Sequence, residues 1–205
     1  CVYFLENLGI PVKNDLGSVR YLCDLSMDEK SKLFGELLKM MTREVPDRYV
    51  KYIPKLISGE TYEFTFEEDY TPFKDASEYS TVINACGRNN NYELGMDVIK
   101  GHRAQRHVEL EALVKEHKQY LAQSLTKIQE NNSVEIMDNI QYFNGDDVKA
   151  SVVGTIAGML LNNYDWQKPI VGYTHIDSDT PGYKVSLRCS RLLGYDGVHY
   201  GNLVR

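Results

Sequence analysis

Near the end of the sequence, segment 183–190 (Tyr-Lys-Val-Ser-Leu-Arg-Cys-Ser) has the pattern of a short β-strand with one polar face. Because side chains alternate between the two faces of a strand, that face carries Lys184, Ser186, Arg188 and Ser190. Ammonium, guanidinium and hydroxyl groups in one row are suited to bind an oxyanion. The alternative is a solvated edge strand whose charges prevent aggregation, and the strand alone does not separate the two interpretations.

The segments before this strand are expected to place it in a mixed sheet. We predict a strand at 134–143, a glycine- and alanine-rich helix at 148–161 and a second strand at 169–174, followed by a turn. Small residues on the predicted helix indicate close packing on the sheet: Gly154, Ala157 and Gly158. The expected fold class is α/β (α+β), with a mixed sheet flanked by helices.

The first part of the chain is expected to be helical and self-contained. Ser26 and Glu29 form a capping box ahead of a helix that runs to about residue 44, and a short second helix follows between two prolines. A Ser-Gly pair closes this region. We therefore predict a small all-helical region at 1–58 and an α/β domain at 59–205.

Four more elements are predicted between these regions. Residues 60–67 alternate aromatic and polar side chains, which is typical of a strand. Asp75 is expected to cap a helix that ends at Gly87. Segment 94–99 is ambiguous between strand and helix, and apolar residues at a spacing near 3.6 predict the longest helix at about 104–130.

The composition is that of a globular protein, with 42% hydrophobic and 25% charged residues. No apolar run is long enough to span a membrane and no signal-peptide pattern opens the chain, so we expect a cytoplasmic protein without a membrane partner. A net charge of −6 argues against coating nucleic acid by bulk electrostatics, although positive charge gathers locally at 100–107 and 184–191. Both chain ends fall inside predicted helices, so we expect a piece of a longer protein.

No metal ligand or catalytic residue is assigned from the sequence. Segment 177–179 (Asp-Ser-Asp) and nearby His175 resemble a ligand cluster, but Asp and Ser are favoured in turns for local backbone bonding. The four cysteines form no Cys-x-x-Cys pair, so neither a zinc site nor a disulfide framework is indicated. We expect His117 and Cys86 in the core.

Several motifs give the sequence a likeness to a known family. The order Val-Gly-x-x-Ala (153–157), Lys-Pro with an apolar strand (168–172) and Val-Ser-x-Arg (185–188) resembles the DHH-associated domain of the DHH phosphoesterases. Segment 75–88, which contains Asn-Ala-Cys-Gly-Arg, looks like a signature of the archaeal RecJ-like branch, which includes the GINS-associated nuclease. The resemblance covers about residues 60–205.

The resemblance implies the substrate-binding part of an exonuclease that hydrolyses phosphodiester bonds in single-stranded DNA or RNA. Ser186 and Arg188 would contact a substrate phosphate, and Lys184 would strengthen the local positive field. Asn84 and Arg88 would face the bound nucleic acid from a helix end; the alternative for this cation is that it complements the helix dipole.

Two features of the family do not occur in this sequence: the Asp and His motifs of its N-terminal metal domain, including Asp-His-His, and the Gly-Gly-Gly-His motif that contacts phosphate. Because two-metal hydrolysis needs carboxylate and imidazole ligands, we expect Mn²⁺ or Mg²⁺ in that other domain, no cofactor in this chain and no nuclease activity from it alone. The alternative function is a non-catalytic replication scaffold that docks GINS and the replicative helicase through the helical region.

Overall fold

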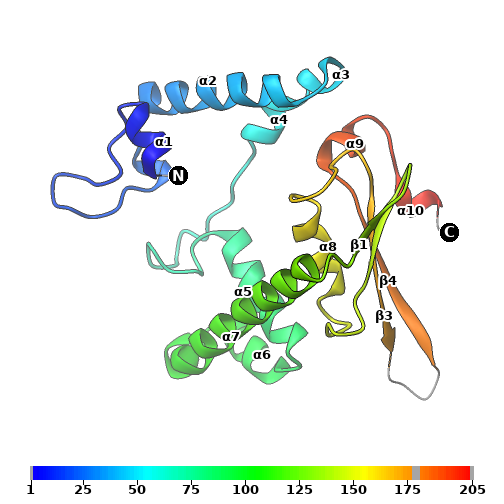
Figure 1. Cartoon of the computed structure of the whole chain (residues 1–205). Coiled ribbons are helices and arrows are strands. Elements are labelled where there is room, and N and C mark those ends of the chain that lie inside the picture. The colour runs from blue at the N-terminus through cyan, green and yellow to red at the C-terminus, as the bar shows by residue number, and fades with distance from the viewer. Residues whose placement is uncertain (1, 177–180, 204–205) are drawn as a thin grey trace. The chain divides into compact units, whose positions relative to one another are not determined.

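The computed structural model describes residues 2–176 and 181–203, and the chain divides into two compact units (Figure 1). The first unit is Cys1–Glu60 and the second is Thr61–Arg205. This division falls two residues after the boundary expected from the sequence. No helix in the described part of the chain combines the length and the apolar character that crossing a membrane requires.

The described residues of the first unit form helices and loops. The elements are α1 (Val2–Asn7), a 3-10 turn (Leu22–Asp24), α2 (Met27–Glu44), α3 (Asp47–Val50) and α4 (Ile53–Ile57). The capping box is confirmed: the Ser26 hydroxyl accepts from the Glu29 amide at 3.2 Å, and the Glu29 carboxylate accepts from the Ser26 amide at 2.7 Å. The single short helix predicted between the prolines is two helices, with Pro54 in the first turn of α4.

The second unit is built on a four-stranded mixed sheet. Its strands lie in the order β1 (Val134–Ile136), β2 (Gln141–Asn144), β3 (Ile170–Ile176) and β4 (Gly182–Arg188). Strands β2 and β3 are parallel and are connected through helix α8 (Val153–Leu160), whereas the other neighbours are antiparallel. A mixed sheet with flanking helices confirms the predicted fold class.

The remaining described helices of this unit are α5 (Ala76–Arg88), α6 (Tyr92–Ile99), α7 (Arg103–Glu130), α9 (Arg191–Tyr195) and α10 (Tyr200–Leu203). The predicted cap of α5 is confirmed, because the Asp75 carboxylate accepts from the amides of Ser77 and Glu78 at 2.8 and 2.9 Å. Helix α5 ends at Arg88, one residue beyond the predicted Gly87.

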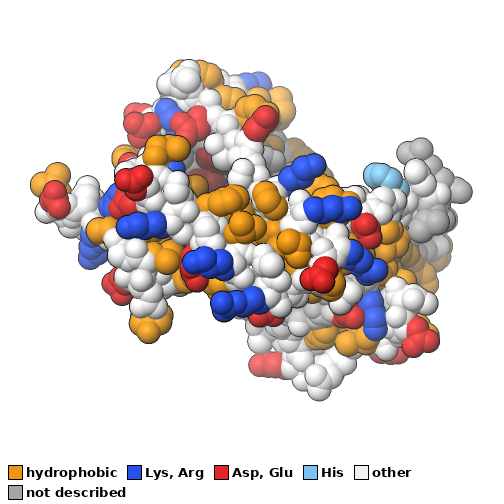
Figure 2. Space-filling model, turned by 90° about the horizontal axis from the view of Figure 1, so that it is seen from above, with side chains coloured by type: hydrophobic (Ala, Val, Ile, Leu, Met, Phe, Trp, Pro, Cys, Tyr) orange, Lys and Arg blue, Asp and Glu red, His pale blue; other side chains and the backbone are white. Residues whose placement is uncertain are grey.

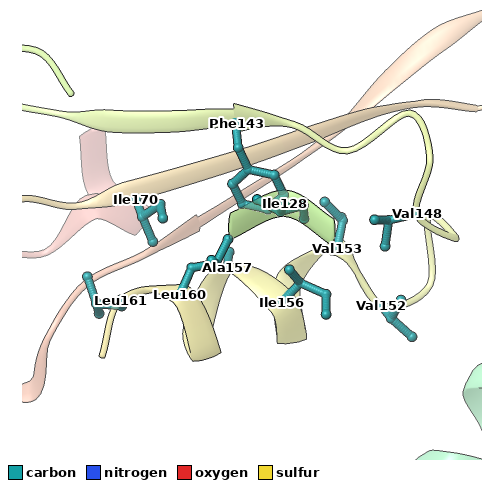
Figure 3. Packing of buried hydrophobic residues seen from close by; sticks show 10 residues of the cluster. All are labelled: Ile128, Phe143, Val148, Val152, Val153, Ile156, Ala157, Leu160, Leu161 and Ile170. Atoms are coloured by element: carbon teal, nitrogen blue, oxygen red, sulfur yellow. The ribbon is translucent and has the colours of Figure 1, made fainter. Parts of the chain in front are cut away.

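The core of the second unit has two clusters of buried side chains. In one cluster α8 packs on the sheet, and its members are Ile128, Phe143, Val148, Val152, Val153, Ile156, Ala157, Leu160, Leu161 and Ile170 (Figure 3). The other lies among α5, α6 and α7 and contains Phe73, Val82, Cys86, Leu94, Val98 and Leu110. Helix α7 contributes to both clusters, which joins the helical part of the unit to the sheet.

A glycine on β3 makes room for the largest side chain under the sheet. Phe143 points from β2 toward α8 in Figure 3 and is fully buried. A Cβ atom at Gly172, on the neighbouring strand, would lie only 2.5 Å from the Phe143 ring. Gly172 therefore lets the ring approach the β3 backbone closely.

The prediction of a strand at 60–67 is wrong. This segment forms turns, and its backbone contributes an isolated bridge from Glu63 to Asp75. Phe64 packs on Tyr79 with ring centroids 5.5 Å apart, whereas Phe66 is 79% exposed. The segment does alternate aromatic and polar residues, but among the described residues no neighbouring strand pairs with it.

The prediction of one continuous strand at 134–143 is also wrong. It is a hairpin of β1 and β2, and the Met137 amide donates to the Ile140 carbonyl at 2.8 Å across the turn. The predicted helix at 148–161 begins later, at Val153, because the segment before it forms turns. Segment 94–99, ambiguous from the sequence, is part of α6.

Candidate anion-binding site

Three polar side chains project from one face of the edge strand β4. In the antiparallel register with β3, Lys184, Ser186 and Arg188 stand opposite Thr174, Gly172 and Ile170. Directly opposed residues of an antiparallel pair share a face of the sheet. These three β3 residues are buried, and Ile170 belongs to the cluster that α8 covers. The polar row therefore lies on the α8 side of the sheet.

Ser190, the fourth residue expected in this row, is not part of it. Strand β4 ends at Arg188, and the Ser190 hydroxyl accepts a hydrogen bond from the Leu193 amide at 3.3 Å. Serine is a favoured N-cap residue because its hydroxyl satisfies an amide of the first helical turn. Ser190 therefore starts α9, and the prediction that it shares the polar face was wrong.

Ser186 and Arg188 meet the first turn of α8 at Gly154. The Nε atom of Arg188 donates to the Gly154 carbonyl at 3.1 Å. A Cβ atom at position 154 would lie 2.6 Å from the Ser186 hydroxyl and 2.9 Å from Arg188 Nη2, so a side chain here would collide with both. Arg188 is nevertheless exposed and Ser186 is half-buried. The glycine thus brings helix backbone, hydroxyl and guanidinium together at a surface that solvent reaches.

The start of α8 adds the electrostatics of a helix N-terminus. The first N–H groups of a helix have no acceptor within the helix, and their dipoles favour an anion. Val152, which occupies the N-cap position, makes no side-chain capping bond. The guanidinium of Arg188 and the hydroxyl of Ser186 therefore lie next to a helix N-terminus that its N-cap side chain does not cap.

Arg88 is tied to the segment that leads into α8. Its Nη1 atom donates to the Ser151 carbonyl, and the Ser151 hydroxyl donates to the Arg88 carbonyl at 3.1 Å. These two bonds brace the C-terminal end of α5 against the chain just before Gly154. Arg88 therefore holds its positive charge beside the start of α8.

Lys149 is a neighbouring cation that the sequence alone did not single out. Burial lowers the pKa of His117, and the positive charges of Arg88 and Lys149 lower it further. Both cations therefore lie close enough to the imidazole to disfavour its protonated form. Lys149 precedes the Val-Gly-x-x-Ala motif by four residues. This proximity to the motif is the sequence feature that could have identified it as a candidate site residue.

His117 is the core histidine that the sequence predicted. It is 8% exposed, and its Nδ1 atom lies 3.2 Å from the side-chain amide of Asn89. Cys86 is also buried as expected, and burial raises the pKa of its thiol.

Asn84 and Lys184 lie at the margins of the site. Asn84 is one turn before Arg88 on α5, is exposed, and its side-chain nitrogen lies 3.4 Å from the Ser80 hydroxyl. Lys184 is exposed on β4, two residues from Ser186. Within the described residues, no hydrogen bond or ion pair joins either side chain to Ser186 or Arg188.

The other concentration of basic residues, at 100–107, is largely neutralised. Arg106 contacts Asp97, Glu109 and Glu93 at 2.8, 2.9 and 3.5 Å, and Arg103 pairs with Glu67. On the face shown in Figure 2, basic and acidic side chains are likewise interspersed. This cluster is therefore not a free basic surface.

The Asp-Ser-Asp segment at 177–179 lies outside the described residues. His175 is within them, and its Nδ1 atom lies 3.0 Å from the Asp146 carboxylate. Between residues 2–176 and 181–203, no group of three or more His, Cys, Asp or Glu side chains is arranged to hold a metal ion.

A short part of the chain is similar to a protein from an archaeon. No family model matches the chain. The chain is similar to uncharacterized protein MJ1071 of the archaeon Methanocaldococcus jannaschii, with 38% identity over 63 residues. That segment is 31% of this chain and spans 18% of the relative. The comparisons thus show an archaeal relative over part of the chain.

Proposed function

We propose that Ser186, Arg188 and the first turn of α8 bind a phosphate group of single-stranded nucleic acid. The observation that carries the proposal is their convergence at Gly154, which is so close that a Cβ atom there would collide with both side chains. A guanidinium fork, a hydroxyl and the N-terminal end of a helix supply three kinds of donor to a tetrahedral oxyanion. Their exposure leaves the site open to a large ligand.

Further cations favour a polymer of phosphates over a single small anion. Lys184 extends the row along β4, while Arg88 and Lys149 add positive charge where the chain enters α8. Contacts of this kind to successive phosphates supply affinity that does not depend on base sequence. The net charge of −6 makes a localised surface of this type necessary for any such binding.

The motifs that resemble archaeal RecJ-like DHH proteins support the same function, because they meet in space. Arg88 ends the Asn-Ala-Cys-Gly-Arg motif and bonds to Ser151, three residues before Gly154. Gly154 lies in the Val-Gly-x-x-Ala motif, and Arg188 of the Val-Ser-x-Arg motif bonds to it. Three motifs that are far apart in the sequence thus converge at one helix end.

We infer that the chain is the substrate-binding part of a metal-dependent exonuclease of this kind. Its residues would hold the phosphate backbone and orient the scissile phosphodiester bond, and orientation of this kind lowers a reaction barrier by roughly several kcal/mol. When bound in the family's N-terminal domain, Mn²⁺ or Mg²⁺ supplies an activated water and neutralises charge on phosphate oxygens.

A second candidate function, a replication scaffold that docks GINS or the replicative helicase, is favoured by one observation. No residue of the 18-residue helix α2 is fully buried, although Leu33, Leu37 and Met41 recur at helical spacing. An apolar stripe that stays partly exposed is suited to a protein partner. This function would need no contact between Arg188 and nucleic acid.

Binding of a fluorescently labelled single-stranded oligonucleotide to the full chain tests the first proposal. We expect Arg188→Ala to weaken binding by roughly tenfold and to reduce the slope of log affinity against log salt by about 1. Arg43→Ala, at an exposed arginine of the first unit, is the matched control and should change neither quantity. Equal affinity of the Arg188→Ala variant and the parent chain would contradict the phosphate-binding role.

A further inference from the structure

The edge strand β4 has one side that no other strand among the described residues covers. It lies at the end of the sheet order, next to β3, and no other described segment forms a ladder with it. An unpaired edge strand presents a row of backbone N–H and C=O groups that can pair with another strand. On the face away from α8, Tyr183 and Val185 are 56% and 62% exposed.

We propose that two copies of the chain associate by antiparallel pairing of their β4 strands. In such a two-fold arrangement each β4 strand pairs with its copy, so every residue pair away from the axis occurs twice. Directly opposed residues must come from the same face of the sheet, which limits the possible registers. The pairing is argued from β4 alone and does not depend on anion binding.

The charges on β4 exclude two of these registers. A two-fold axis at Lys184 would place two ammonium groups against each other, and an axis at Ser186 would place Lys184 opposite the partner's Arg188. Like charges directly opposite one another destabilise a strand pair. An axis at Val185 instead places Lys184 opposite the partner's Ser186, and Arg188 opposite the partner's Gly182.

Strand length favours the same register. Strand β4 has seven residues, and an axis at its central residue, Val185, pairs all of them. An axis at Tyr183 or Leu187 pairs only the three residues nearest that end of the strand. On the open face, the central register also places Tyr183 opposite the partner's Leu187 and Val185 opposite the partner's Val185.

This pairing would join two four-stranded sheets into one continuous sheet of eight strands. The exposed Tyr183 and Val185 side chains of the two copies would cover part of each other across the axis. On the α8 side, the partner's Lys184 would stand beside Ser186. Each candidate anion site would then receive a cation from the other copy.

Sedimentation of the full chain without nucleic acid measures the association directly. We expect a dimer at micromolar concentration, and Val185→Lys should weaken it by at least about tenfold because two lysines would meet at the axis. Val108→Lys replaces an 81% exposed valine on α7 and should leave the dimer unchanged. A chain that stays monomeric, or a dimer that tolerates Val185→Lys, would overturn the proposal.

Cysteine cross-linking tests the register in a chain whose Cys1, Cys23 and Cys189 are replaced by serine. Opposed residues of antiparallel strands have Cα atoms about 4.5–5.5 Å apart, which a disulfide spans. Val185→Cys should therefore form a covalent dimer on mild oxidation. Tyr183→Cys should not, since it faces the partner's Leu187. Efficient cross-linking at 183 without cross-linking at 185 would exclude this register.

Discussion

The guanidinium of Arg188 is bonded to the carbonyl of Gly154, with 3.1 Å between Nε and the oxygen. This bond ties the edge strand β4 to the first turn of α8 and fixes the direction of the arginine fork. The side chain stays exposed despite the bond. A cation that is both anchored and open to solvent loses less conformational entropy when it binds an anion.

Gly154→Ala should damage both the packing and the site. The added Cβ would lie 2.6 Å from the Ser186 hydroxyl, and we expect the free energy of unfolding to fall by about 1–3 kcal/mol as β4 and α8 separate. Urea denaturation measures the loss, and oligonucleotide affinity should fall with it. Gly158→Ala is the matched control: nothing lies within 4 Å of its added Cβ, so the alanine should stabilise α8 by up to about 1 kcal/mol. Similar effects of the two substitutions would refute the close approach at Gly154.

Gly172 and Phe143 should be energetically coupled. Gly172→Ala alone would place a Cβ 2.5 Å from the Phe143 ring and should destabilise the second unit by about 1–3 kcal/mol. Phe143→Ala alone should cost about 3–5 kcal/mol because the ring is fully buried. In the double variant, the alanine at 172 should cost less than in the parent, since the ring is gone. A double-mutant cycle by urea denaturation measures this, and strict additivity would argue against the contact.

The ion pair between Arg103 and Glu67 should hold the loop before α5 onto α7. The Glu67 side chain is only 8% exposed, and the Arg103 guanidinium lies 4.9 Å from the centre of the Phe73 ring. Glu67→Ala would leave the arginine without this partner and should cost about 1–3 kcal/mol in thermal or urea unfolding. The exposed pair of Glu36 and Lys39 provides the control, because Lys39→Ala should cost at most about 1 kcal/mol.

The first unit should lose stability in acid through Glu29. Hydrogen bonds from Arg20 and from the Ser26 amide lower the pKa of Glu29 from 4.5 to about 2. Because the folded-state pKa is lowered, the stabilisation is fully present above about pH 4.5 and is lost as the pH falls toward 2. Glu29→Gln should therefore be less stable than the parent at pH 7, and the difference should shrink as the pH falls and disappear below about pH 2. Thermal unfolding between these pH values measures the difference, which should stay constant if Glu29 has no such role.

The local signals in the sequence predicted most helices correctly. The caps at Ser26 and Asp75 depend on residues within three positions of each other, so the sequence contains all the information that they need. Ser190 shows the limit of such reasoning, since the same serine can continue a strand or cap a helix. Which of these occurs depends on where the partner strand ends.

The parts that failed depend on contacts between distant segments. Residues 60–67 have a strand-like alternation, but a strand also needs a neighbour, and the described structure provides only the bridge to Asp75. The basic residues at 100–107 are adjacent in the sequence, whereas the acids that neutralise Arg103 and Arg106 include Glu67 and Asp97 from other elements. The roles of Gly154 and Lys149 likewise appear only when α8 packs on the sheet.

Helix α7 places Leu110 in one core cluster of the second unit and Ile128 in the other. At 1.5 Å per residue, its 28 residues form a rod about 42 Å long. Interrupting such a rod breaks consecutive hydrogen bonds, so the rod resists bending between the clusters. The helical and sheet halves of this unit should consequently melt in a single cooperative transition, and the slowest-exchanging amides of both halves should report the same free energy of opening.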